Sequence, residues 1–224
     1  MSQGSGVSYN DRTLVLGFSG SGKSELTNHH FSAIRCQRLL VDTKDEWVVD
    51  GVERVAEVAS IDWSAPLIHF SPIDNDLDAF DELFRLAYRR RHLVVCVHEL
   101  GDLCDFRAHA TPAGVRTYLS KGRAHGLGLL GASQRPVEMP KRALTEAQHV
   151  FVLVPRMSGA DLDAIGQMVD RPGSEVGELV DQAHEQLGDH SFLWFNRWTR
   201  ELVACKPLGE DARRKTIVRK RTVA

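Results

Sequence analysis

The stretch Gly17-Phe18-Ser19-Gly20-Ser21-Gly22-Lys23-Ser24 decides which fold this chain can adopt. It matches the phosphate-binding loop pattern GxxxxGK[ST], whose glycines let backbone N–H groups wrap around a polyphosphate. Lys23 is expected to place a positive charge beside the β and γ phosphates, and Ser24 to offer its hydroxyl to Mg²⁺. A helix that begins here would direct its N-terminal dipole at the same anion. The stretch therefore predicts a nucleoside-triphosphate site, with ATP and Mg²⁺ as the expected ligands.

The residues on either side of this loop are typical of a strand and a helix. Residues 12–16 are a short run rich in β-branched and leucine side chains, and residues 24–31 form a plausible helix. Strand, loop and helix is the order that the motif requires. The alternative is a Gly/Ser-rich turn in an unrelated α/β protein, which this order disfavours.

Apolar runs alternate with helical patterns along the chain, which predicts an α/β fold with a mostly parallel sheet covered by helices on both faces. The expected strands are residues 13–16, 38–42, 67–70, 93–97, 127–132 and 150–154, and the expected helices are residues 23–35, 77–91, 112–124 and 141–147. Two further helices, near 159–169 and 174–186, precede an expected hairpin of 191–195 with 201–205. With the phosphate loop, this pattern predicts a P-loop NTPase domain that ends in helices and a β-hairpin.

The chain of 224 residues, 42% of them hydrophobic, fits one large domain better than two small ones. We expect a flexible N-terminus at 1–11, the ATPase domain at 12–208 and a flexible basic tail at 209–224. The tail holds six basic residues and no acidic ones from position 213 onward, namely Arg213, Arg214, Lys215, Arg219, Lys220 and Arg221. It either contacts nucleic acid or an acidic partner, or is a solubilising end.

Membrane, secreted, disulfide-rich and zinc-ribbon classes are disfavoured by the sequence. No run approaches 18 uncharged apolar residues, and the N-terminus lacks the basic and apolar regions of a signal peptide. The four cysteines lack CxxC spacing and read as reduced thiols of a cytoplasmic protein. Cys96, His98 and Cys104 are imaginable as metal ligands, but no matching second pair accompanies them.

Two polar residues follow other buried runs and are candidates for hydrolysis. Glu99 follows the apolar run 93–97 and His98, at the end of an expected core strand. A phosphate loop needs a carboxylate at such a strand end, either to polarise the attacking water or to help hold Mg²⁺. Its alternative is an ordinary exposed carboxylate at a strand end. Gln134 emerges after the run 127–132, at the carboxyl edge that parallel strands share. An amide there can sense the γ-phosphate or orient water.

The order of these segments resembles the FtsK/HerA superfamily of DNA-translocating ATPases. The phosphate loop is followed by Asp42-Thr-Lys44-Asp-Glu46, then by His98-Glu99, and then by Gly131-Ala-Ser-Gln134-Arg-Pro136. The second and last of these segments argue against small-molecule kinases, GTPases and RecA-type helicases. The resemblance spans about residues 12–155.

The resemblance implies roles for individual residues. Lys23 and Ser24 would bind phosphate and Mg²⁺, Glu46 would line the nucleotide site, Glu99 would activate water and share in Mg²⁺ binding partly through water, and Gln134 would act as the sensor. Family members usually carry Asp-Glu where this chain has His98-Glu99. Because a neutral imidazole cannot replace a carboxylate beside Mg²⁺, three alternatives follow: Glu99 serves both roles, hydrolysis is slow, or Ser24 and the phosphates hold the metal.

Members of that superfamily work as rings, so the resemblance also implies a homo-oligomer, hexameric or pentameric, and double-stranded DNA as partners. An arginine from one subunit completes the neighbouring site and stabilises charge on the γ-phosphate. The candidates are Arg123 and Arg116, with Arg135 third. Cationic loops facing the channel would hold DNA through its phosphates, and the candidates there are Arg107, His109, Lys141 and Arg142.

A single-domain motor of this size resembles the genome-packaging ATPases of membrane-containing icosahedral viruses. The leading hypothesis is therefore a viral or mobile-element motor that pumps double-stranded DNA, acting in the host cytoplasm or at the virion vertex, with capsid vertex proteins as candidate partners. The alternatives are a cellular or plasmid motor of the same superfamily, and a nucleotide-dependent switch or assembly protein with weak hydrolysis.

Overall fold

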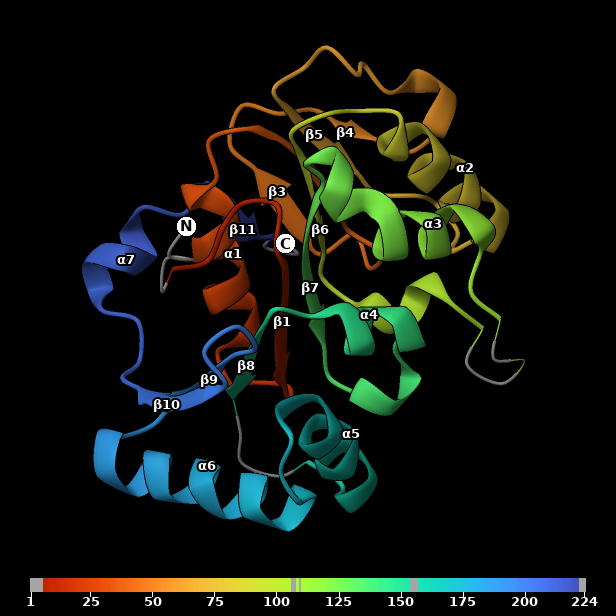
Figure 1. Ribbon diagram of the computed structural model, residues 1–224. Coiled ribbons are helices and arrows are strands. Elements are labelled where there is room, and N and C mark those ends of the chain that lie inside the picture. Colours follow the sequence, from red (N-terminus) through yellow and green to blue (C-terminus); the bar gives the residue numbers. More distant parts are fainter. Residues whose placement is uncertain (1–5, 106–107, 109, 154–156, 222–224) are drawn as a thin grey trace.

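The described residues form one central sheet of nine strands, and seven adjacent strands of this sheet run parallel to one another (Figure 1). The computed structural model describes residues 6–105, 108, 110–153 and 157–221. In sheet order the strands are β10 (Glu201–Cys205), β9 (Phe192–Asn196), β8 (His149–Leu153), β1 (Arg12–Gly17), β7 (Gly128–Ser133), β6 (Leu93–Val97), β2 (Gln37–Val41), β5 (Leu67–Phe70) and β4 (Arg54–Val55). β9 pairs antiparallel with both β8 and β10, so the hairpin extends the parallel sheet at one edge. The expected mostly parallel sheet is confirmed.

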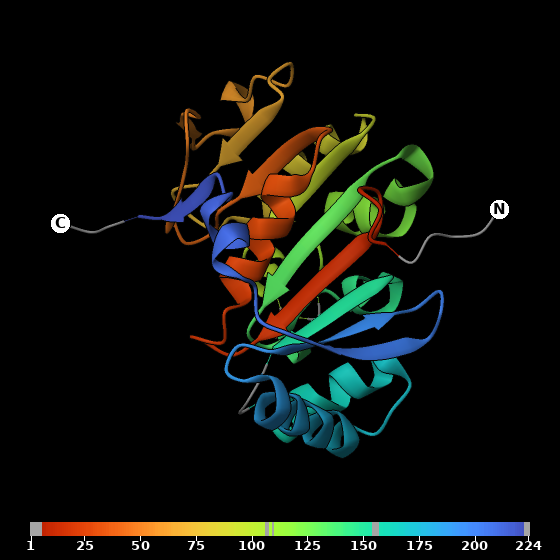
Figure 2. The ribbon, with the colours of Figure 1, turned by 90° about the vertical axis from the view of Figure 1, so that its left-hand side faces the viewer.

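Helices cover both faces of this sheet, which makes three layers (Figures 1 and 2). The α-helices are α1 (Lys23–Ala33), α2 (Leu77–Tyr88), α3 (Ala113–Lys121), α4 (Lys141–Glu146), α5 (Gly159–Val169), α6 (Gly173–Leu187) and α7 (Glu210–Arg214). Short 3₁₀ turns lie at Val58–Ser60, Leu100–Leu103, Gly122–His125 and Pro136–Glu138. α1 covers one face together with a small ribbon of β3 (Trp47–Val49) and β11 (Val218–Lys220), and α2 to α6 pack into the core on the other.

Alternation of side chains within the strands supplies a core on each face. In β1, Leu14 and Leu16 belong to the core under α2 to α6, whereas Val15 belongs to the core under α1. All three are fully buried, as are most residues of β6. Strands buried on both faces read as continuous apolar runs, which is why the sequence located them.

Most predicted elements lie within one to three residues of their expected ends, and the differences are local. Three strands, Leu67–Phe70, Leu93–Val97 and Glu201–Cys205, and the helix Gly159–Val169 have the expected bounds. β3, β4 and β11 were not predicted, because strands of two or three residues carry too little periodic pattern to register.

The N-terminal residues expected to be flexible are attached to the domain from Ser8 onward. Asp11 is 5% exposed, accepts a hydrogen bond from the Ser8 backbone N–H, and lies 3.2 Å from Nε2 of buried His149. The Tyr9 hydroxyl lies 2.7 Å from Nδ1 of His92. Polar partners across the end of the sheet therefore fix a segment whose own composition gives no signal of order.

The basic segment expected to be a flexible tail is folded onto the domain over its described residues, 209–221. β11 pairs antiparallel with β3, and Val218 is 1% exposed in the core beneath α1. α7 lies beside α1, as Figure 2 shows. The backbone pairing and the burial of Val218 outweigh the disordering effect of the basic composition.

Gly131 on β7 allows the segment after β6 to pack closely against the sheet. A Cβ at this position would lie 2.1 Å from Cδ1 of Leu100, which is fully buried. We expect Gly131→Ala to displace Leu100 and to lower the free energy of unfolding by about 1–3 kcal/mol, the usual cost of overpacking. Urea denaturation would measure it. Gly209→Ala, where the added Cβ has open space, is the matched control, and equal stability of both variants would contradict the expectation.

Candidate nucleotide-binding and hydrolysis site

The loop 17–24 joins the end of β1 to the start of α1 at the carboxyl edge of the sheet. Gly20 and Gly22 have φ angles of 82° and 90°, which side-chain-bearing residues rarely adopt. Gly22 immediately precedes α1, so the loop turns its backbone toward the helix N-terminus. This is the geometry that presents N–H groups to an anion.

A cavity of about 550 Å³ opens over this loop. Ser19, Gly20, Gly22, Lys23 and Ser24 of the loop line it, together with Glu46 and Gln134. These seven of the expected site residues therefore share one cavity. Gly17 and Ser21 of the same loop are not among its lining residues.

Lys23 carries its charge into a largely buried position. The residue is only 7% exposed, and burial, partly opposed by Glu99, lowers the pKa of its ammonium group. The side-chain oxygens of Ser21 and Asn28 are buried and have no hydrogen-bond partner among the described residues. A buried cation and unpartnered polar atoms are costly unless a ligand satisfies them. The cavity therefore fits a phosphate-bearing ligand.

A second cavity of about 690 Å³ adjoins the first and holds Glu99. Lys44 and Gln134 line both cavities and so stand between them. Glu99 accepts a hydrogen bond of 2.6 Å from the Ser133 hydroxyl through Oε1, and its Oε2 lies 3.7 Å from the Lys44 ammonium. Both contacts fix the carboxylate of a residue that is 9% exposed, so its alternative interpretation as an ordinary exposed carboxylate does not hold.

Strand register explains why these groups meet. β7 lies between β1 and β6, with Ser133 opposite Leu16 and Gly131 opposite Val97. Glu99 is two residues beyond Val97, and Ser133 is two residues beyond Gly131, so the two side chains lie at the same height along the neighbouring chains. Gln134 leaves β7 beside the start of the phosphate loop. Three parallel strands thus deliver the loop, the carboxylate and the amide to one edge.

Asp42 organises the turn that follows β2. The residue is fully buried, and its carboxylate accepts hydrogen bonds from the backbone N–H groups of Lys44, Glu46 and Trp47 at 3.3, 3.2 and 2.9 Å. His69 Nε2 lies 3.6 Å from Oδ2, a distance at which the contact is electrostatic. Burial alone would raise the pKa of Asp42, but His69 and these N–H groups outweigh it and lower that pKa. Asp42 thereby holds Lys44 and Glu46 on the cavity wall.

His98 directly precedes Glu99, and its ring is neutral. Both ring nitrogens are buried and have no hydrogen-bond partner in the described structure. Burial, opposed in part by Asp42, lowers the pKa of His98 to about 3. The ring meets Trp47 edge-on with centroids 4.4 Å apart. His98 therefore packs beneath the cavity wall and carries no charge that would hold a cation.

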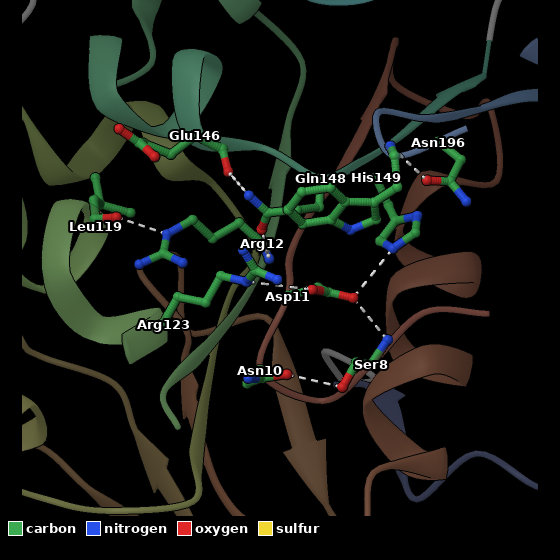
Figure 3. A network of polar contacts seen from close by, with 11 residues as sticks. Ser8, Asn10, Asp11, Arg12, Leu119, Arg123, Glu146, Gln148, His149 and Asn196 are labelled. Atoms are coloured by element: carbon green, nitrogen blue, oxygen red, sulfur yellow. Dashed lines mark hydrogen bonds and ion pairs between the residues drawn. The ribbon is translucent and has the colours of Figure 1, made fainter. Parts of the chain in front are cut away.

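The three candidate arginines lie at different places. Arg135 lines the cavity of Glu99, where its guanidinium lies 3.3 Å from buried Asp161 and 3.4 Å from Glu138. Arg116 is exposed on α3. Arg123 lies at the opposite end of the sheet from the phosphate loop, in the network of Figure 3.

In that network Arg123 has partners within its own chain. Its Nε lies 3.7 Å from Oδ1 of Asp11, and its guanidinium lies 4.5 Å from the ring centre of Trp198. Its neighbour Arg12 is 2% exposed and donates to the Leu119 carbonyl. Arg123 does not meet the other candidate site residues, so only a neighbouring subunit would bring it to a phosphate. Of the channel candidates, Lys141 and Arg142 are exposed at the start of α4, and Arg107 and His109 lie outside the described residues.

Several residues of the cavity were not anticipated from the sequence. His29 comes from α1, Trp47 from β3, His190 from the turn before β9, and Thr216, Val218 and Lys220 from the C-terminal segment. His190 Nδ1 would lie 3.3 Å from a Cβ at Gly22, so its ring packs over the loop. None of these belongs to a motif, and only the position of Trp47 directly after Glu46 offered a signal.

The strand order and the loop define the class of fold to which this domain belongs. β1 leads through a glycine loop with a buried lysine into α1. In the parallel sheet, β7 lies between β1, which carries the loop, and β6, which Glu99 follows. This arrangement is the P-loop NTPase fold. Within the described residues, no three His, Cys, Asp or Glu side chains form a metal-binding group, Cys96, His98 and Cys104 included. Nor does any described helix have the length and apolar character needed to cross a bilayer.

Comparison with solved structures supports this fold. The genome packaging NTPase B204 from Sulfolobus turreted icosahedral virus 2, in complex with ATP-gammaS, superposes with a TM-score of 0.73 and 19% identity, covering 91% of this chain and 100% of that one. B204, the DNA-packaging ATPase from Sulfolobus Turreted Icosahedral Virus, gives 0.69 and 17% identity over 89% of this chain and 98% of that one. No protein-family model matches the chain, and no curated protein matches it in sequence. The fold expected from the superfamily resemblance is confirmed.

The burial of Lys23 leads to a first test of the site. We expect Lys23→Ala to weaken ATP binding at least tenfold, because a cation that hydrogen-bonds phosphate contributes roughly 1.5–3 kcal/mol. Isothermal titration calorimetry would measure the affinity. Lys121→Ala removes an exposed lysine of α3 and should leave it unchanged. Equal affinity of the two variants would contradict the placement of phosphate at this loop.

The lowered pKa of Asp42 predicts a pH-dependent contribution to stability. Such a group stabilises the fold above its unfolded pKa, near 3.8, and this contribution is lost as the pH falls through the lower folded value. Asp42→Asn should therefore lower the free energy of unfolding by about 1–3 kcal/mol at pH 7. The gap to wild type should narrow below about pH 4. Denaturant titrations across this range would measure it, with exposed Asp181→Asn as control; a gap that widens on acidification would refute the role.

Proposed function

We propose that this chain is an ATPase that translocates double-stranded DNA, most specifically a viral genome-packaging motor. The observation that carries the proposal is the shared edge at which the phosphate-loop cavity adjoins the cavity of Glu99, with Gln134 lining both. The similarity in fold to a genome packaging NTPase, over nearly the whole of both chains, supports the choice of motor.

The chain's own residues divide the work of hydrolysis. Lys23 and the loop N–H groups hold the β and γ phosphates, and Ser24 together with Glu99, partly through water, would hold Mg²⁺, which neutralises phosphate charge when bound. Water attacks the γ-phosphorus, the bond to the ADP oxygen breaks, and Glu99 accepts the proton of the water. Ser133 and Lys44 orient Glu99 for this step. Gln134 contacts the γ-phosphate or the water between the two cavities.

A ring of subunits, hexameric or pentameric, would complete this site. Arg123, Arg116 and Arg135 remain the candidates for an arginine offered to the neighbouring γ-phosphate. Arg123 would have to leave Asp11 and Trp198, whereas Arg116 is exposed, and Arg135 already stands at the rim of the Glu99 cavity. Lys141 and Arg142 are exposed candidates for contact with DNA phosphates. Capsid vertex proteins are the further partners that a packaging motor would need.

A second function, a nucleotide-dependent switch or assembly protein, is favoured by one observation. The His98 ring is neutral, with both nitrogens buried, where a metal-holding carboxylate is usual, so the protein would bind ATP but hydrolyse it slowly. A cellular or plasmid motor with the same site is the third candidate, and capsid genes beside the coding gene would distinguish packaging from it.

Hydrolysis stimulated by double-stranded DNA would test the motor. We expect Glu99→Gln to lower the stimulated rate by about 100-fold or more while ATP still binds, because a general base contributes 10²–10⁴-fold and Gln keeps the shape of the side chain. Phosphate-release assays with and without DNA would measure it. Glu82→Gln, on an exposed position of α2, is the control. Tight ATP binding with negligible turnover in the wild type would favour the switch.

A further inference from the structure

The C-terminal segment 216–220 forms part of the wall of the nucleotide cavity. Thr216, Val218 and Lys220 line it. Within β11, Val218 and Lys220 share one face because successive side chains of a strand point to opposite sides. Arg219 and Arg221 lie on the other face. There Arg219 pairs with Asp50 at 2.9 Å and Arg221 with Asp45 at 2.6 Å.

Contacts on two sides hold this segment in place. On the side of β3, Val218 is opposite Val49 and Lys220 is opposite Trp47, and the Arg221 N–H donates to the Glu46 carbonyl at 2.7 Å. On the side of α1, the Ile217 N–H donates to the Ser32 hydroxyl at 3.0 Å. The segment therefore bridges α1 and the turn built on Asp42.

This arrangement leaves one cation of the segment facing the cavity. Within the described structure, Arg219 and Arg221 are neutralised by aspartates, whereas no ion pair of Lys220 is found. Lys220 shares the cavity with Lys23 and Lys44, the two other lysines that line it. Its position opposite Trp47 places it beside the turn that carries Lys44 and Glu46. A third lysine on the wall raises the attraction for a ligand with several negative charges.

We propose that the segment 216–220 is a closing wall of the nucleotide site, and that Lys220 binds the polyphosphate of the nucleotide. This inference rests on the proposed nucleotide binding at loop 17–24 and adds a binding residue that no motif contains. It also assigns the basic segment to the nucleotide instead of to DNA. By reciprocity, bound nucleotide stabilises the docking of the segment on β3 and α1.

The matched pair Lys220→Gln and Arg219→Gln tests the role of the cation. We expect Lys220→Gln to weaken ATP binding about fivefold and AMP binding less, since an exposed charge contact contributes up to about 1 kcal/mol and AMP carries fewer phosphates. Arg219→Gln, one residue away on the outer face, should leave both affinities unchanged, and Lys220→Arg should restore ATP binding. Calorimetric titration of ATP and AMP at two salt concentrations would measure this.

Hydrogen exchange of the wild-type chain tests the wall without any substitution. Saturating ATP should slow exchange at the backbone N–H groups of Ile217 and Arg221 more than AMP does, because the first donates to the Ser32 hydroxyl of α1 and the second to the Glu46 carbonyl. Unchanged exchange, or a loss of DNA affinity in Lys220→Gln with intact ATP affinity, would overturn the inference while leaving the nucleotide site standing. Absence of ATP binding in the wild type would instead refute the proposed function itself.

Discussion

The parallel pairing of β1, β7 and β6 is the constraint on which the site depends. Parallel strands end at one edge, and their register sets how far each polar residue extends beyond it. With Ser133 opposite Leu16 and Gly131 opposite Val97, the Ser133 hydroxyl reaches Glu99 and Gln134 lies beside the phosphate loop. A shift of one residue would turn these groups to the opposite face. The register is held by continuous burial on both faces of the strands.

A second layer of structure encloses the edge and depends on one buried carboxylate. Asp42 ties down the N–H groups of the turn after β2, which fixes Lys44 and Glu46 on the cavity wall and leads the chain into β3. β3 in turn supplies the edge on which β11 docks. His98 and Trp47 fill the space beneath this wall. The site thus combines a loop encoded in one short stretch with a wall drawn from both ends of the chain.

Much of the fold could be predicted because its signals are local. The phosphate loop, the doubly buried strands and the amphipathic helix α2 each show their character within a dozen residues. Glu99 and Gln134 could be chosen because each follows an apolar run, although their roles remain proposals. The contacts of the two ends could not be predicted: Asp11 is held by His149, 138 positions away, and β11 by β3, about 170 positions away. The amino-acid composition of the two ends gives no sign of either contact.

The sequence by itself determined that a phosphate loop stands between a strand and a helix in a mostly parallel α/β domain, because glycine conformation and apolar periodicity are properties of neighbouring residues. It also showed that a histidine directly precedes Glu99. Only the tertiary structure decided that the ring nitrogens of this histidine are buried and the ring neutral, that Arg123 lies at the far end of the sheet, and that the basic C-terminal segment lines the nucleotide cavity. These outcomes depend on which distant residues supply burial and counter-charge, and the folded chain alone brings those residues together.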